Sequence, residues 1–212
     1  MLGPEFWHEI KNKTVIDFGC GVGAEAVEMA EKGAGKVIGV DYQERWLKVA
    51  REHAARASVS DRCTFTTHSA EFADIIIAID SFEHFNDPGG ILSQMRGMLN
   101  RGGYVLAAFG PTWYHPLGGH LFSVFPWSHL IFTEKALIRW CSDFKTDGAT
   151  RFSEVAGGLN QMTIRRFERI VEQSQFRFAA FEARPIRQLK PLANRFTREF
   201  TTSIVRCKLV PK

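Results

Sequence analysis

Three glycines at alternate positions and one aspartate mark the first place where this chain could do chemistry. Gly19, Gly21 and Gly23 follow a β-branched run in TVIDFGCGVG, residues 14–23. Such a loop lets a ligand approach the backbone, and the helix after it offers unpaired N–H groups to an anionic group. Asp41 ends a second apolar run about twenty residues later, where a carboxylate can accept both hydroxyls of a ribose. The pair predicts a nucleoside pocket, for a dinucleotide or an adenosyl sulfonium.

A second candidate group follows a later apolar run, in the stretch SFEHFNDP at residues 81–88. Histidine changes its charge near neutrality, so His84 is a candidate general base. The alternative is a histidine that only makes a hydrogen bond beneath a lid. Glu83 is expected chiefly to anchor the turn.

Residues 111–162 contain proline, glycine and aromatic side chains without a clear period. Tyr114, His115, His120 and His129 could line a pocket with aromatic walls, which suits a flat or apolar acceptor. Of these four, Tyr114 and His115 are the catalytic candidates. The alternative is a lid whose histidines bond to backbone. No carboxylate or cysteine stands at ligand spacing from these histidines, so we predict no metal site.

The elements that must position these groups alternate along the chain. Apolar patterning predicts strands at residues 14–19, 36–41, 63–69, 73–80, 104–110, 178–186 and 201–210. Helices are predicted at residues 23–34, 43–57, 89–100 and 162–176. This order predicts an α/β fold with a doubly wound, mostly parallel sheet. We expect a single domain over residues 1–212, with residues 111–162 as a substrate-recognition insert after the fifth strand.

Bulk composition limits the classes of protein that fit. With 212 residues and 45% hydrophobic content, the chain suffices for one substantial domain. Its four cysteines lie far apart and form no CxxC pair, which favours a reducing, cytoplasmic location. No N-terminal run has the length of a signal peptide or a membrane span, so no stable membrane insertion is expected. Residues 145–212 carry 14 lysines and arginines against 6 acidic residues.

Four motifs, taken in order, resemble a known family. VIDFGCGVG, VIGVDYQERWLKVA, HSAEFADIIIAIDSFEHFNDP and MLNRGGYVLAAFGP are similar to class I S-adenosylmethionine-dependent methyltransferases, of the small-molecule type with a LEHV-like turn after strand four. The resemblance covers residues 13–111 specifically. Dehydrogenases differ, because their fingerprint needs a glycine where this chain has Ala24, and because Asp17 precedes the turn as in methyltransferases. The resemblance implies a Rossmann-like methyltransferase fold with seven strands.

The resemblance also implies which residues hold the methionine part of the cofactor. Asp17 would organise the glycine loop and contact the methionine amino group through water. Gly19, Cys20 and Gly21 would lie against the methionine portion. Asp80, at the end of strand four, would lie near the methionine amino group or the transferable methyl group.

The adenosine part is assigned by the same resemblance. Asp41 would take the ribose hydroxyls, and Tyr42 would flank the adenine. Ser69, Ala70 and Glu71 occupy the turn that usually meets the adenine edge. The family often carries Asp at the position of Ser69, so the backbone N–H of Ala70 is left to make the adenine contact.

The function that the resemblance implies is methyl transfer from S-adenosylmethionine to oxygen, nitrogen or carbon of a small-molecule acceptor, with S-adenosylhomocysteine as the product. Because the sulfonium is already activated, the protein would mainly supply orientation and exclude water from an in-line displacement. One alternative is an RNA methyltransferase that uses the basic C-terminal third, although a nucleic-acid partner is not expected. Another is a scaffold that binds the cofactor without catalysis.

Overall fold

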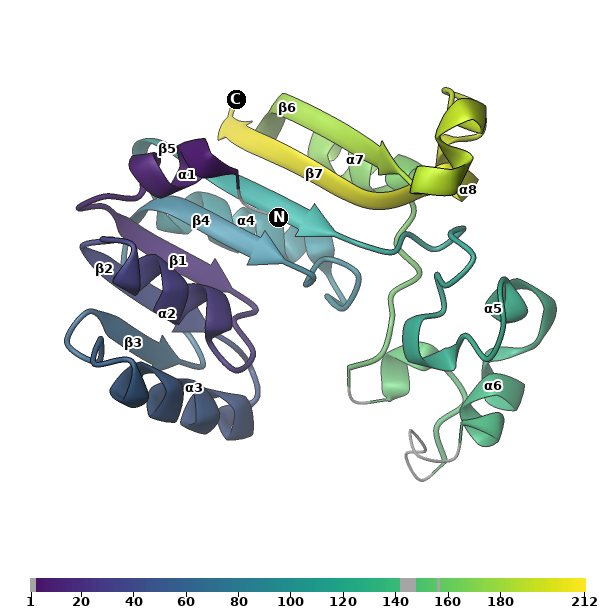
Figure 1. The fold of residues 1–212 in the computed structure, drawn as a ribbon, viewed down its shortest axis with the longest axis horizontal. Helices are drawn as coiled ribbons and strands as arrows, with labels where there is room; N and C mark the ends of the chain where they lie inside the picture. Colours follow the sequence, from purple (N-terminus) through teal and green to yellow (C-terminus); the bar gives the residue numbers. More distant parts are fainter. Residues whose placement is uncertain (1–2, 142–147, 156) are drawn as a thin grey trace.

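Seven strands form one twisted sheet with helices on both faces (Figure 1). The structure is a computed structural model that describes residues 3–141, 148–155 and 157–212. The strand order is β3-β2-β1-β4-β5-β7-β6, and β7 alone runs opposite to the other six strands. The predicted doubly wound, mostly parallel seven-stranded sheet is confirmed.

The first half of the chain alternates between strands and helices. Its elements are α1 (Pro4–Glu9), β1 (Thr14–Phe18), α2 (Ala24–Glu31), β2 (Lys36–Val40), α3 (Glu44–Arg56), β3 (Cys63–Thr66), β4 (Ala73–Ile79), α4 (Pro88–Met98) and β5 (Leu99–Phe109). Asp87 begins α4, because its side chain accepts a hydrogen bond from the N–H of Gly90 at 2.9 Å. No helix in the described part of the chain is long and apolar enough to cross a membrane.

The second half begins with short elements and ends with a strand pair. Its elements are η1 (His120–Phe122), α5 (Ser128–Ile131), α6 (Glu134–Trp140), η3 (Phe152–Glu154), α7 (Ile164–Gln173), β6 (Phe176–Pro185), η4 (Arg187–Leu192), α8 (Arg198–Thr201) and β7 (Thr202–Pro211). Thr163 caps the N-terminus of α7, since its hydroxyl accepts the N–H of Arg166 at 3.1 Å.

Alternate residues of the central strands supply two cores, one on each face of the sheet. In β1, Val15 packs with residues of α1, α2 and α3, whereas Ile16 packs with residues of α4 and α7. The four consecutive residues of β4 from Ile75 to Ala78 are all buried, as expected for a central parallel strand. Burial on both faces fixes the register of the strands and therefore the position of the loops at their ends.

The strand order reverses between β1 and β4, which pair in parallel with Ile16 opposite Ile76. Loops that leave the carboxyl ends of β1, β2 and β4 therefore meet at one edge of the sheet. In doubly wound folds this is the place where ligands bind.

Residues 111–162 are called the insert below, and residues 142–147 and 156 within it lie outside the described residues. Its described parts leave that same edge after β5 and lead back to α7 (Figure 1). They have a small core of their own, formed by Phe122, Leu137, Ile138, Phe152, Val155 and Leu159. The two ends of the insert meet where the N–H of Trp113 donates to the carbonyl of Met162 at 2.8 Å.

Candidate functional site

Each of the three glycines after β1 has a separate structural reason. All three have positive φ, and a Cβ on Gly19 would lie 2.6 Å from the Ser81 hydroxyl oxygen. A Cβ on Gly23 would lie 2.7 Å from Ala50 and 2.8 Å from the Phe65 ring. A Cβ on Gly21 would meet no atom of the described residues within 4 Å. Gly19 and Gly23 thus serve close packing, whereas Gly21 borders open space that a ligand could fill.

Asp41 joins the ends of β1 and β2. One carboxylate oxygen of Asp41 accepts the N–H of Gly21 at 3.0 Å, and the other accepts the N–H of Gln43 at 2.9 Å. A carboxylate offers about four acceptor positions, so each oxygen keeps a further lone pair. The carboxylate is therefore fixed in orientation and still able to accept two hydroxyl groups.

Asp17 lies at the end of β1 and is buried, with 2% of its surface exposed. Its Oδ2 atom has no hydrogen-bond partner among the described residues. Burial, together with the nearby carboxylates of Glu25 and Asp41, raises the pKa of Asp17 from its usual 3.8 to about 8. Without a ligand, Asp17 is accordingly protonated at neutral pH.

Asp80 follows β4 in the left-handed backbone region, with φ of 47°, and its N–H donates to the carbonyl of Ala108 at 2.8 Å. Partial desolvation raises the pKa of Asp80, and the Glu25 carboxylate raises it further, whereas His84 opposes both effects. Asp17, Glu25, Asp41 and Asp80 thus gather around the strand ends. Glu25 was not predicted, although an acidic residue in the first turn after a glycine loop is a usable signal.

The other residues that the resemblance assigns to the cofactor site differ in their exposure to solvent. Cys20 is buried, and desolvation raises the pKa of its thiol. Tyr42 is 75% exposed beside the open space. The Ser69 hydroxyl accepts the N–H of Glu71 at 3.1 Å, and Ala70 between them is exposed.

Glu71 forms an ion pair with Lys36, the first residue of β2. The pair therefore lies at the amino ends of the strands, whereas Asp41 follows the carboxyl end of β2. This placement separates Glu71 from the carboxylates at the strand ends.

Glu83, His84 and His120 come together at the root of the insert; we call them the carboxylate–histidine cluster. One possible ligand atom from each residue lies within 4.8 Å of the other two. Glu83 is 3% exposed, its Oε1 accepts the N–H of Gly110 at 3.2 Å, and its Oε2 has no described partner. Burial raises the pKa of Glu83 to about 8. Glu83 therefore anchors the turn, as predicted, but with only one of its oxygens.

Backbone carbonyls set the tautomers of both histidines in the cluster. Nδ1 of His84 donates to the carbonyl of Gly158 at 2.9 Å, and Nε2 of His120 donates to the carbonyl of Pro111 at 3.0 Å. In a neutral imidazole the other nitrogen then carries a lone pair. Burial and the neighbouring histidines lower the pKa of His120, so this ring is neutral at pH 7.

The two insert residues predicted as catalytic make contacts within the C-terminal half. Nδ1 of His115 accepts the N–H of Leu117 at 2.9 Å. The ring of Tyr114 lies 5.1 Å from that of Phe200 in α8. His115 is close enough to His120 to lower the pKa of that ring, whereas Tyr114 faces α8.

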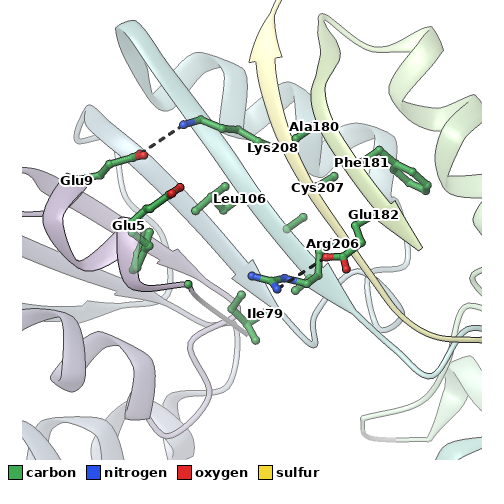
Figure 2. Close-up of a pocket in the computed structure, with 14 residues that line it drawn as sticks. Glu5, Glu9, Ile79, Leu106, Ala180, Phe181, Glu182, Arg206, Cys207 and Lys208 are labelled. Carbon is green, nitrogen blue, oxygen red and sulfur yellow. Dashed lines mark hydrogen bonds and ion pairs between the residues drawn. The ribbon is translucent and has the colours of Figure 1, made fainter. Parts of the chain in front are cut away.

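A cavity of about 370 Å³ lies elsewhere, on the sheet face between α1 and strands β5, β7 and β6 (Figure 2). The ion pairs Glu9–Lys208, at 3.4 Å, and Glu182–Arg206, at 3.8 Å, border it. None of the strand-end carboxylates lines this cavity, so it is separate from the predicted nucleoside pocket.

Comparison with known proteins gives three findings. A family model described as a methyltransferase domain matches residues 9–113. A ubiquinone biosynthesis O-methyltransferase of Neisseria meningitidis is 34% identical over 104 residues, which are 46% of this chain and 44% of the relative. A protein of the same name from Leptothrix cholodnii is 29% identical over 157 residues, 63% of each chain. The chain thus spans about half the length of these relatives.

Among solved structures, magnesium protoporphyrin IX methyltransferase from Synechocystis PCC 6803 with bound SAH has a TM-score of 0.61. Its sequence identity is 17%, and the match covers 97% of this chain and 76% of that one. At this identity the likeness shows the fold, which extends over nearly all of the chain.

Proposed function

The chain belongs to the class I S-adenosylmethionine-dependent methyltransferases, and from this premise we propose that it transfers the methyl group of S-adenosylmethionine to an oxygen of a small-molecule acceptor. The observation that carries the proposal is the 3.0 Å contact between the Asp41 carboxylate and the N–H of Gly21. It joins a carboxylate for ribose hydroxyls and a glycine loop for the methionine portion in one pocket.

The residues at the strand ends fit this donor. Gly21 borders open space, and Asp17 offers a buried oxygen that has no partner among the described residues and that an ammonium group could approach. A bound ammonium would favour the ionised form of Asp17. Glu25 and Asp80 add negative charge nearby, which favours a positively charged sulfonium over its neutral thioether product.

The proposed donor site therefore contains Asp17, Gly19, Cys20, Gly21, Asp41, Tyr42 and Asp80, with Glu25 added. Ser69 and Ala70 are retained for the adenine edge. Glu71 is left out, because its ion pair with Lys36 lies at the opposite ends of the strands.

The acceptor is proposed to bind between Asp80 and the insert. The names of the relatives support an oxygen acceptor, and the aromatic side chains of the insert support a flat or apolar one. Nδ1 of His84 is occupied by the Gly158 carbonyl, so Nε2 is the atom available to take a proton from an acceptor hydroxyl. Tyr114 and His115 remain candidates for the acceptor side.

Calorimetry and an acceptor screen test the proposal together. We expect S-adenosylmethionine and S-adenosylhomocysteine to bind, NADH not to bind, and a hydroxylated aromatic acceptor to release S-adenosylhomocysteine. Binding of NADH in place of both adenosyl compounds would overturn the donor assignment. Donor binding without turnover on oxygen, nitrogen or carbon acceptors would support a non-catalytic scaffold.

A further inference from the structure

The carboxylate–histidine cluster lies where the insert joins the sheet. Glu83 and His84 follow β4, whereas His120 belongs to the insert. Their partners Gly110, Pro111 and Gly158 belong to the two segments by which the insert leaves and returns. We propose that Glu83, His84 and His120 bind a divalent first-row transition metal ion at this junction.

The donor set matches that chemistry. Two imidazoles and one carboxylate suit zinc, iron, cobalt or manganese, whereas magnesium prefers a set made of oxygens. A ligand histidine usually donates its second ring N–H to a carbonyl or carboxylate, which fixes the tautomer. Both histidines of the cluster show this arrangement, on the carbonyls of Gly158 and Pro111.

The Glu83 carboxylate supplies an independent reason. With 3% of its surface exposed, this side chain is buried, yet its Oε2 has no hydrogen-bond partner among the described residues. A buried polar atom without a partner is costly and calls for an explanation. A cation between this oxygen and the two imidazoles would remove the cost.

Metal binding needs only a small closure of the cluster. Ligand atoms now lie within 4.8 Å of one another. Bonds of about 2.0–2.2 Å in tetrahedral geometry would hold them roughly 3.4 Å apart. His84 is the exposed member of the cluster, so packing confines its side chain least.

The metal would also define the acceptor more closely, a step that rests on the proposed function. Three protein ligands leave coordination positions open for an acceptor oxygen, and a metal ion lowers the pKa of a bound hydroxyl. The hydroxyl proton passes to solvent, and the oxygen then attacks the methyl carbon. The C–O bond forms as the C–S bond breaks, and the electron pair stays on sulfur. His84 would then be a ligand rather than the base.

Cobalt(II) is the probe for a direct test, since it reports binding by its visible absorption. The chelator-treated, untagged protein is titrated with CoCl₂, and one equivalent is expected to bind. Glu83→Gln and His120→Ala should each weaken binding by more than about tenfold, because even an outer partner of a ligand contributes 10- to 100-fold. His53→Gln is the matched control, since His53 also donates through Nδ1 to a carbonyl, that of Val22 at 2.9 Å.

Circular dichroism shows that each variant is folded, and parallel calorimetry with S-adenosylhomocysteine separates the two proposals. The metal site is overturned if cobalt does not bind to the parent protein, or if it binds equally well to the parent, Glu83→Gln and His120→Ala proteins. This holds even where S-adenosylhomocysteine still binds. Cobalt binding that depends on these residues supports the site, even where no adenosyl compound binds and the proposed function fails. Magnesium chloride in excess should not displace the cobalt.

Discussion

At the scale of single residues, Asp41 has the most direct effect on the donor. Its two oxygens hold the N–H groups of Gly21 and Gln43, so the carboxylate is ordered before a ligand arrives. We expect Asp41→Ala to weaken S-adenosylhomocysteine binding tenfold or more, since a hydrogen bond to a charged acceptor contributes roughly 1.5–3 kcal/mol. Titration calorimetry measures the change.

Asp61→Ala is the control for Asp41, because Asp61 is exposed and its ion-pair contact with Arg62 is long, at 3.9 Å. This variant should bind S-adenosylhomocysteine as tightly as the parent protein does. The affinity of Asp41→Asn should lie between those of Asp41→Ala and Asp61→Ala, since the amide keeps one acceptor oxygen. Equal affinities for all three variants would exclude the ribose role.

Asp17 makes stability depend on pH in a predictable direction. In the folded protein its pKa is about 8, against a usual 3.8, so between these values only the folded chain keeps the proton. The free energy of unfolding must therefore fall as pH rises from about 4 to about 8, by at most about 1.4 kcal/mol per pH unit. Asp17→Asn stays neutral and avoids this loss.

Urea unfolding of both proteins without ligand, from pH 5 to pH 9, measures the effect. The parent protein should lose stability relative to the Asp17→Asn variant as pH rises, and the difference should level off above pH 8 to 9. The Asp61→Asn control should follow the parent protein. A constant difference between parent and Asp17→Asn across the range would contradict the raised pKa.

Residue spacing could predict one part of the site and not the other. Asp41 and Gly21 each follow a parallel strand, and β1 and β2 pair directly, so the sheet itself brings them together. Helix α4 and strand β5 separate Glu83 from His120 in the chain, and only the fold of the insert brings the two residues together. Because the insert has no regular apolar period, its pattern does not indicate which carboxylate lies beside its histidines.

At the scale of elements, the loop between β1 and α2 combines packing and binding. Gly21→Ala adds a methyl group to open space at φ 49°, a left-handed conformation that costs about 1–2 kcal/mol. Gly23→Ala places the methyl group 2.7 Å from Ala50 and 2.8 Å from the Phe65 ring. We expect the Gly21 variant to fold and bind the thioether weakly, and the Gly23 variant to lose more stability.

Thermal melting and calorimetry on the two variants distinguish these effects. Gly97→Ala serves as a control, because a Cβ there meets no atom of the described part of the chain within 4 Å and the position lies inside α4. It should leave binding unchanged. A Gly21→Ala protein with full affinity would show that the open space beside this residue is not the donor site.

Periodicity predicted the elements around that loop well, because burial on one or both faces dictates the pattern. Strand β4 was recognised from its continuous apolar run. Strand β5 begins at Leu99, whereas the pattern predicts a start at residue 104. The strand is longer because residues on both sides of a register shift pair with β4, Leu99 with Ala73 and Tyr104 with Ile75. The short elements of the insert were not predicted, because six buried apolar residues far apart in the sequence hold them together.

At the scale of the whole molecule, part of the basic charge in the C-terminal third is paired within the fold. Arg184 and Arg206 share Glu182, and Arg198 pairs with Glu168 at 2.5 Å. These contacts reduce the charge available to a polyanion. We therefore expect no gel shift with RNA at low salt, the condition under which nonspecific nucleic-acid binding is strongest.

The insert and the sheet have separate cores, so they should respond separately to mutation. Phe152 is fully buried in the insert and stacks on Phe122 with ring centroids 4.5 Å apart. Phe152→Ala should remove about 3–5 kcal/mol from this small core, to which six buried residues of the described part contribute, and unfold the insert. The donor residues follow the strands of the sheet, so S-adenosylhomocysteine affinity should change less than about twofold.

Methyl transfer and cobalt binding should both fall more than tenfold in the Phe152→Ala protein, because His120 and the Gly158 carbonyl depend on the folded insert. Limited proteolysis should cut this variant within residues 111–141 and 148–155 and leave the parent protein intact in those two ranges. Phe196→Ala, at a side chain that is 72% exposed, is the matched control and should resist the protease. If the Phe152→Ala protein lost both the fold of the insert and the binding of S-adenosylhomocysteine, the two cores would form one cooperative unit. The acceptor side could not then be altered independently of the donor side.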